Sequence, residues 1–206
     1  KAKGISLTEL VTVDKTRPSI ELNLDNVEAE LLPGSESNQE VINKVLDAGR
    51  LMLAADSIGA SQIMLDKAVA YSLERKQFGR VIGSFQAVKH MCAEMAAELE
   101  PCHSMIWHAA HCYDHDPSQA RLMACHTKAH VSEVGQQISK TATEVHGGMG
   151  FTDELGLHYW FKRIGLNRQL LGSPELVREE AARIQNFDQS PAGGQSKKEV
   201  GNPLLV

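Results

Sequence analysis

Residues 144–152 read Glu-Val-His-Gly-Gly-Met-Gly-Phe-Thr and separate a long helical pattern from a shorter one. Glycine occupies three of the four positions from Gly147 to Gly150. Because glycine adopts positive φ without a steric cost, such a turn can bring backbone N–H groups close to an anion or a flat ring. A tight corner between two helices is the alternative interpretation. The turn alone leaves both interpretations open.

A second region, residues 70–86, favours a binding role for this turn. It contains Arg-Lys-Gln-Phe-Gly at residues 75–79 and Ile-Gly-Ser-Phe-Gln at residues 82–86. Together with the glycine turn, these residues resemble the acyl-CoA dehydrogenase family, whose C-terminal helical domain carries R-x-x-F-G, I-x-x-F-Q and H-G-G-x-G-Y/F-T in that order. The motifs lie about seventy residues apart, which suits one long helical hairpin at about 1.5 Å per residue. The resemblance covers about residues 4–185.

The apolar pattern predicts a bundle of long helices. Apolar residues recur at spacings of three and four over residues 40–76, 84–113, 119–145 and 153–166. A fifth helix begins at Ser173 and Pro174 and runs to about residue 186. We expect Ser37 or Asn38 to cap the first helix and Pro101 to kink the second. Long helices joined by short corners predict an antiparallel bundle, so the fold class is mainly α with a short β segment in front.

The first part of the chain has a different pattern. Residues 5–13 and 20–31 alternate apolar and polar side chains, which predicts two β-strands. Two strands do not form a stable sheet alone. The resemblance implies that residues 1–34 are a remnant of the family's middle β-domain, whose remainder lies outside this sequence. We expect residues 35–186 to form the helical bundle and residues 187–206, which are polar and glycine-rich, to be a disordered tail.

Composition sets outer limits on function. The 206 residues carry a formal net charge of −5, so no basic surface argues for nucleic acid. No apolar run approaches the roughly 18 residues of a membrane helix, and no signal-peptide pattern is visible. The first residue is Lys1 rather than Met, so we expect a fragment whose beginning lies elsewhere.

Four cysteines, Cys92, Cys102, Cys112 and Cys125, fall within helical patterns without C-x-x-C spacing. Free, buried thiols indicate a reducing compartment such as the bacterial cytoplasm or the mitochondrial matrix. Histidines and one cysteine also form i,i+4 pairs on the second and third helices, but no third metal ligand has a defined spacing to any pair. Partly exposed polar helix faces are the alternative that we favour over a metal site.

The resemblance implies that FAD binds across a subunit interface, with the bundle of one subunit holding the adenine and pyrophosphate end of its neighbour's flavin. Arg75 matches the arginine that meets the pyrophosphate, a role that suits the guanidinium fork. Phe78 matches a ring near the adenosine half, and Gln86 matches a polar FAD contact. Without the flanking motifs, Arg75 would be interpreted as a solvated cation that pairs with Glu74 or Glu98.

In the glycine turn, the resemblance implies that Gly147 and Gly148 contact the adenine end through their backbone, with Val145 and His146 in the same loop. The sequence departs from the family at Glu144, where glutamine is usual. An ionised carboxylate can only accept hydrogen bonds. Glu144 could still accept one from the adenine amino group or from a ribose hydroxyl.

Two further pairs match family contacts. Ser173 and Glu175 match a T-x-E that touches FAD, and their alternative role is a helix N-cap with an acidic first turn, worth about 1 kcal/mol. Asp47 and Arg50 match positions that contact the CoA portion of the substrate. Their alternative is an exposed Asp and an exposed Arg on a helix face.

The family reaction needs a carboxylate that removes the α-proton of the acyl-CoA thioester, and the family places it at one of two positions. These positions are Leu171 and Gly49 in this chain, and neither residue can accept a proton. General-base catalysis typically contributes about 10²- to 10⁴-fold. Glu175 and Asp47 are the carboxylates that could substitute. The chain therefore carries cofactor motifs without a recognisable base.

These features together lead to the hypothesis that the chain is a subunit of a heteromeric acyl-CoA dehydrogenase. Such an assembly resembles the bacterial enzymes that act on sterol side-chain CoA esters. The chain would complete the FAD site of a partner subunit, and the resemblance implies an electron-transfer flavoprotein as electron acceptor. A catalytically inactive, FAD-independent scaffold is the main alternative. An ordinary homomeric dehydrogenase with an unrecognised base, or an acyl-CoA oxidase, also remains open.

Overall fold

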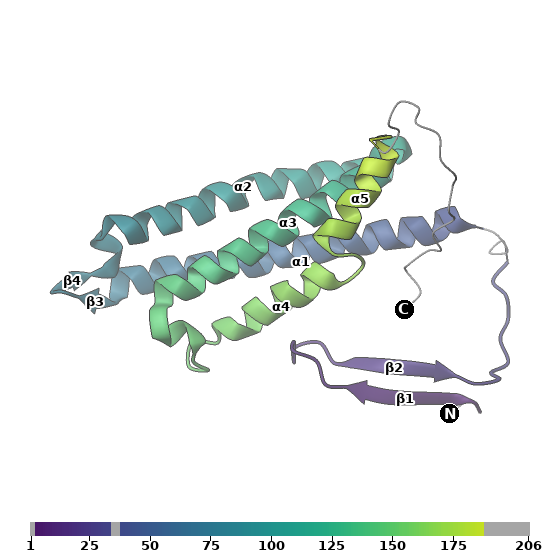
Figure 1. Cartoon of the computed structure of the whole chain (residues 1–206), viewed down its shortest axis with the longest axis horizontal. Helices are drawn as coiled ribbons and strands as arrows, with labels where there is room; N and C mark the ends of the chain where they lie inside the picture. Colours follow the sequence, from purple (N-terminus) through teal and green to yellow (C-terminus); the bar gives the residue numbers. More distant parts are fainter. Residues whose placement is uncertain (1–2, 34–37, 188–206) are drawn as a thin grey trace, which may run out of the picture.

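The computed structural model describes residues 3–33 and 38–187. In chain order the elements are β1 (Ile5–Leu10), β2 (Ser19–Leu24), α1 (Gln39–Glu74), β3 (Lys76–Gln77), β4 (Arg80–Val81), the 3₁₀ turn η1 (Ile82–Ser84), α2 (Gln86–His115), α3 (Pro117–His146), the 3₁₀ turn η2 (Gly147–Phe151), α4 (Leu157–Gln169) and α5 (Pro174–Ile184). Three long helices, α1, α2 and α3, run side by side, α4 lies along α1 and α3, and α5 packs against α3 (Figure 1). The predicted mainly α fold with a leading β segment is confirmed.

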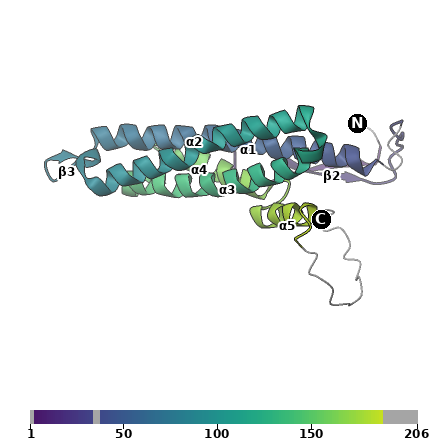
Figure 2. The same cartoon turned by 90° about the horizontal axis from the view of Figure 1, so that it is seen from above.

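Helix α3 lies at the centre of the bundle and has more buried residues than the other described helices. The core joins residues of α1, α2, α3 and α4, among them Met64, Leu99, Ile138 and Ile164. Gly135 permits the close approach of three helices, because a Cβ there would lie 3.2 Å from Ile164 Cγ2 of α4 and 3.2 Å from Ser61 Oγ of α1. Viewed from above, the long helices form one elongated layer and α5 stands to its side (Figure 2).

Local sequence signals set the starts of two long helices, and the predicted cap at Asn38 is confirmed. Its side chain accepts a hydrogen bond from the Val41 amide at 3.3 Å at the start of α1. Asp116, which was not predicted as a cap, caps α3 in the same way, ahead of Pro117. Pro101 lies inside α2, and the kink expected there stays a prediction.

The predicted start of the fourth helix at residue 153 is wrong, because α4 begins at Leu157. The chain after the glycines first forms η2 and a further turn, and Gly156, with φ of 65°, ends that turn. A positive φ is the conformation that an α-helix cannot contain, so the helix can only start after it. The predicted strands also end earlier than expected, at Leu10 and Leu24.

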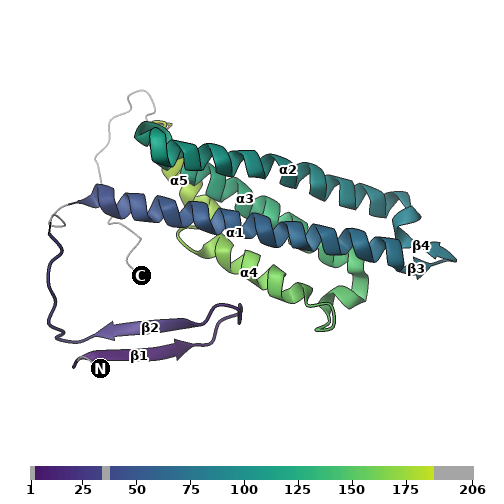
Figure 3. The same cartoon turned by 180° about the vertical axis from the view of Figure 1, so that it is seen from behind.

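The β1–β2 hairpin lies beside the bundle, below α1 in the view of Figure 3. Its pairs Ile5–Leu24 and Leu7–Leu22 share one face, and these side chains are exposed. The hairpin loop is tied to the bundle by Arg17, which donates to Asp56 of α1 at 2.7 Å and to Asn167 of α4 at 2.6 Å.

The predicted tail of residues 188–206 lies outside the described residues, as does Ser37, the other candidate cap. The division into two domains stays a prediction. Within residues 3–33 and 38–187, no helix combines the length and the apolar character needed to span a membrane.

Candidate functional site

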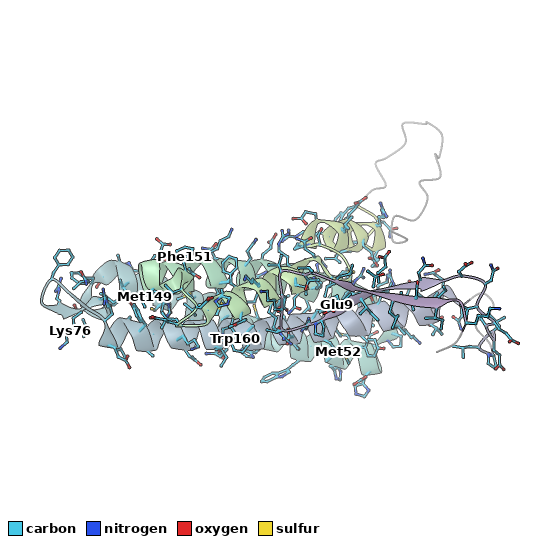
Figure 4. The ribbon with its side chains drawn as sticks, turned by 90° about the horizontal axis from the view of Figure 1, so that it is seen from below. Glu9, Met52, Lys76, Met149, Phe151 and Trp160 are labelled. Atoms are coloured by element: carbon cyan, nitrogen blue, oxygen red, sulfur yellow. The ribbon has the colours of Figure 1, made fainter. Side chains whose placement is uncertain are left out.

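A groove of about 420 Å³ opens where the end of α1 meets the glycine turn. One side comes from α1, β3 and η1, and the other from the end of α3 and from η2. In Figure 4, Lys76 marks this end of the bundle, and Met149 and Phe151 of η2 lie towards it. The lining residues are Tyr71, Arg75, Gln77, Ile82, Glu144, Val145, His146, Gly147, Gly148 and Met149. The structure therefore brings Arg75 together with the whole of the predicted loop from Glu144 to Gly148.

Arg75 ends α1 and is fixed by its backbone rather than by its side chain. Its N–H donates to the Tyr71 carbonyl at 2.9 Å, and its carbonyl accepts from the Ile82 amide at 2.8 Å. Among the described residues, its exposed guanidinium has no ion pair, so the alternative pairing with Glu74 or Glu98 is not observed. A guanidinium without an internal partner is available to an anion in the groove.

The glycines of the turn fall into two classes. A Cβ on Gly150 would lie 2.6 Å from the Thr143 carbonyl oxygen, so the packing of the turn requires glycine there. Gly148 differs, because a Cβ would meet nothing within 4 Å and its φ is not positive. Gly147 has open space but a φ of 57°. The chain's own structure does not explain Gly148, which leaves bare backbone on the groove surface.

The three residues before the glycines have different environments. His146 is buried and stacks on Tyr71 with ring centroids 4.5 Å apart, and its Nδ1 lies 2.7 Å from the Ala142 carbonyl. Burial lowers the pKa of His146. Val145 belongs to the core, whereas Glu144 is exposed. Of these three side chains, only the carboxylate of Glu144 is exposed to solvent at the groove.

The predicted aromatic and amide contacts lie beside the groove but do not line it. Phe78 is 92% exposed at the tip of the β3–β4 hairpin, where Phe78 and Gly79 have φ of 51° and 79°. Positive φ at both central residues is the requirement of a type I′ turn. Gln86 begins α2, and its amide nitrogen lies 3.2 Å from Nε2 of His90. Contact of Phe78 and Gln86 with FAD stays a prediction.

Ser173 and Glu175 lie at the start of α5, outside the groove. A hydrogen bond from the Ser173 side chain, the Glu175 backbone N–H and Arg168 lower the pKa of Glu175 to about 2. Arg168 Nη2 is 2.8 Å from its carboxylate. Contact of Ser173 and Glu175 with FAD, and Glu175 as a substitute base, stay predictions.

The two family positions for the catalytic base lie against each other. A Cβ on Gly49 would be 2.4 Å from Leu171 Cδ1. Both residues line a pocket of about 390 Å³ that also includes Arg17, Met52, Leu53 and Leu170. Met52 lies on the surface of α1 and is labelled in Figure 4. The two base positions thus share one place in the fold, and that place holds no carboxylate.

Asp47 and Arg50 are only 4% and 2% exposed, so the alternative of an exposed pair on a helix face is wrong. Helices α3 and α5 cover them. Arg50 Nη2 donates to Glu180 of α5 at 2.8 Å, and Nη1 lies 3.3 Å from Asp47. Arg121 of α3 pairs with Glu180 as well. We call Asp47, Arg50, Arg121 and Glu180 the ion cluster. Contact of Asp47 and Arg50 with CoA stays a prediction.

Burial and the guanidinium charges have opposite effects on the two carboxylates of the ion cluster. Burial raises the pKa of Asp47 in spite of Arg121 and Arg50. In Glu180, burial is outweighed by the hydrogen bond and the charge of Arg50, so the pKa is lowered. Sequence reasoning missed Arg121 and Glu180, because no local motif links residues on three different helices. It also missed Tyr71, Ile82 and Met149 as groove residues, although each adjoins a motif that was recognised.

The four cysteines are free, and Cys102, Cys112 and Cys125 are buried. Burial raises the pKa of Cys125 to about 12. Within the described part of the chain, no group of three or more His, Cys, Asp or Glu side chains is arranged to hold a metal ion.

Comparison with known proteins assigns the family. The family model described as acyl-CoA dehydrogenase, C-terminal domain, matches residues 39–185. The acyl-CoA dehydrogenase IpdE2 of Mycolicibacterium smegmatis is 31% identical over 184 residues, which are 89% of this chain and 56% of that protein. CarC, a subunit of the caffeyl-CoA reductase-Etf complex of Acetobacterium woodii, is 41% identical over 111 residues, 54% of this chain and 29% of CarC.

Solved structures agree with this assignment. The glutaryl-coenzyme A dehydrogenase complex with glutaryl-CoA superposes with a TM-score of 0.83 at 27% identity, over 91% of this chain and 48% of that one. The steroid ACAD Tcur3481-Tcur3483 superposes with a TM-score of 0.82 at 26% identity, over 91% of this chain and 50% of that one. The chain spans about half the length of these relatives. It belongs to the acyl-CoA dehydrogenase family, of which residues 39–185 form the C-terminal domain.

Proposed function

We propose that this chain contributes the cofactor-holding and oligomerising helical domain to a flavin-dependent acyl-CoA dehydrogenase, and that it does not supply a catalytic base. One observation carries the proposal. The groove gathers Arg75 and the loop from Glu144 to Gly148 in one concavity, whereas Gly49 and Leu171, the two base positions, meet in an apolar pocket.

The groove suits the adenine and pyrophosphate end of FAD. The free guanidinium of Arg75 can bind pyrophosphate oxygens, and the bare backbone at Gly148 allows close approach. Ile82 and Met149 offer apolar surface to a flat ring. Glu144 can accept a hydrogen bond from the adenine amino group or a ribose hydroxyl. Bound FAD would supply the hydride acceptor for α,β-desaturation of an acyl-CoA thioester.

Because the chain has no carboxylate at either base position, the proton acceptor would come from a partner subunit. The assembly we propose is a homo- or hetero-oligomer with a second dehydrogenase-like chain. Similar folds include a ChsE4-ChsE5 complex, whose two chains have different names. CarC belongs to a caffeyl-CoA reductase-Etf complex, which supports an electron-transfer flavoprotein as the acceptor. The substrate that we propose is a fatty acyl or sterol side-chain CoA ester. The compartment that we propose is a reducing one, such as the cytoplasm.

Charge reversal of Arg75 tests the proposal. We expect Arg75→Glu, with the partner unchanged, to lower FAD retention of the purified assembly by roughly tenfold or more, because a charge-assisted hydrogen bond is worth about 1.5–3 kcal/mol. Flavin per assembly is measured by absorbance after gel filtration. The matched control is Lys44→Glu, which makes the same charge change near the opposite end of α1. Unchanged flavin in Arg75→Glu would refute the proposal.

A FAD-independent scaffold is the second candidate, and the position of Glu144 favours it. Its carboxylate lines the same groove as Arg75 and opposes binding of a phosphate there. Native mass spectrometry of the particle isolated from its source separates the two candidates. A mixed assembly that carries FAD supports the shared site, whereas a particle that never contains FAD supports the scaffold.

A further inference from the structure

The turn at residues 170–172 has a backbone conformation that its sequence does not favour. Leu171 has φ of 57°, in the left-handed region where a non-glycine residue with a branched side chain is uncommon. Gly172 follows with φ of 105°. A strained residue persists only where its surroundings hold it. The structure must therefore contain a group that fixes Leu171.

Arg50 is that group. Its Nε, on α1, donates at 3.0 Å to the Leu171 carbonyl in the connection between α4 and α5. The turn also packs closely on Arg50 and α5, since a Cβ on Gly172 would lie 2.9 Å from Val177 Cγ1 and 3.7 Å from Arg50 Nη2. The other guanidinium nitrogens point to Asp47, Cys125 and Glu180.

The ion cluster keeps the Arg50 side chain in this orientation. With 2% exposure and an acceptor at each of its three nitrogens, the guanidinium is held in the interior. The same geometry places the Leu171 side chain over Gly49, because the direction of a side chain follows from the φ of its own residue.

We propose that Arg50 is a positioning residue, which holds the Leu171 carbonyl and thereby keeps the residue at the base position in its left-handed conformation, rather than a residue that binds CoA. The statement about CoA rests on the proposed function. The statement that Arg50 fixes the conformation of Leu171 does not. A guanidinium suits the role because its planar fork can donate to the Leu171 carbonyl and to the acceptors of the ion cluster at once. An ammonium group is a single point charge on a flexible stem and cannot replace that geometry.

Hydrogen exchange in the purified assembly, read by mass spectrometry over residues 170–176, tests the hold. We expect Arg50→Lys to speed exchange at this turn by about tenfold, with little change in the rest of α1. The control is Arg121→Lys, which alters the ion cluster at a residue that has no hydrogen bond to the turn. If Arg50→Lys does not fold, Glu180→Gln loosens the same guanidinium more gently, and an increase of about threefold is expected. Unchanged exchange at the turn in the variant that folds overturns the proposal.

A double-mutant cycle separates positioning from general packing. Glycine takes positive φ freely, so in a Leu171→Gly background the turn no longer depends on Arg50. The effect of Arg50→Lys on turn exchange should fall there from about tenfold to about twofold or less. An equal factor in both backgrounds would mean that Arg50 only stabilises the interior, and would overturn the positioning role.

Binding of free CoA, measured by calorimetry on the same assemblies, tests the second half of the proposal. Arg50→Lys in the Leu171→Gly background should change CoA affinity by less than about threefold. A loss of about tenfold or more there would make Arg50 a CoA contact and overturn the proposal. If the wild-type assembly binds no CoA, the proposed function fails, while the exchange cycle still decides whether Arg50 holds the turn.

Discussion

The two ends of α1 use charged residues in opposite ways. At its C-terminal end, Arg75 and Glu144 are exposed at a groove and have no ion-pair partner among the described residues. Near its N-terminal end, Asp47 and Arg50 are buried in an ion cluster with Arg121 and Glu180. Each set includes residues for which the sequence predicts ligand contact, Arg75 in the first and Asp47 and Arg50 in the second. Burial distinguishes them, because exposed groups without partners can bind a ligand, whereas buried and paired groups fix the backbone around them.

Removal of Glu180 should produce the largest effect on stability. Glu180→Ala leaves two buried or half-buried guanidinium groups without their shared carboxylate, so we expect the free energy of unfolding to fall by about 3–4 kcal/mol. Urea denaturation measures it. The matched control is Glu133→Ala, which breaks an exposed α3–α5 ion pair with Arg178 and should cost about 1 kcal/mol or less. Equal losses in the two variants would contradict the distinction between buried and exposed charged groups.

Substitution of Gly150 and of Gly148, which represent the two classes of glycine in the turn, should give the next largest effect on stability. Gly150→Ala places a Cβ 2.6 Å from a backbone carbonyl and should lower the free energy of unfolding by about 1–3 kcal/mol. Gly148→Ala meets no atom and should stay within about 0.5 kcal/mol of wild type in stability, since it changes an open surface position. Thermal unfolding and flavin content are measured on both. If Gly148→Ala keeps full flavin, bare backbone at this position is not needed for the ligand.

The sequence could predict the groove better than the ion cluster for a physical reason. Groove residues lie in short motifs at helix ends, where Arg75 and the glycine turn can each be recognised from a few neighbouring residues. The ion cluster joins residues that are far apart in the chain, and the pairing of Arg50 with Glu180 spans 130 positions. Periodicity predicted which segments are helices, but not the register that turns Arg50 inward.

The same limit explains the misplaced start of α4. Asp153 and Glu154 are usual first-turn residues, so the pattern favoured a helix from residue 153. The left-handed Gly156 and the tight packing of Gly150 decided otherwise. The long helices were predicted because their patterns repeat over many turns, whereas one residue in an unusual conformation decides a short connection.

The smallest predicted effect on stability concerns Lys128, a buried residue whose charge interacts with Arg50 of the ion cluster. Its Nζ donates to the carbonyls of Asn167 at 2.8 Å and Arg168 at 3.1 Å, at the end of α4 just before the turn of Leu171. Burial, with Arg50 and Arg168, lowers the pKa of Lys128 from 10.5 to about 8. Between these two values the unfolded chain binds more protons than the folded one, so stability should rise with pH there.

We expect the contribution of Lys128 to rise by about 1–2 kcal/mol between about pH 8 and 10.5. This is less than the full pKa difference implies, because the two carbonyls and Ser132 Oγ, 3.3 Å from Nζ, favour the ammonium form. Urea denaturation across this pH range measures it. In Lys128→Met the rise should disappear, whereas Lys140→Met, on an exposed position of the same helix, should keep it. Because burial raises the pKa of Cys125, its titration lowers stability above about pH 9 in every variant, so the Lys128 contribution is the stability of the wild type minus that of Lys128→Met. A fall of this difference through the range would mean that the carbonyls hold the ammonium more strongly than burial disfavours it. The end of α4 would then depend on the charge of Lys128.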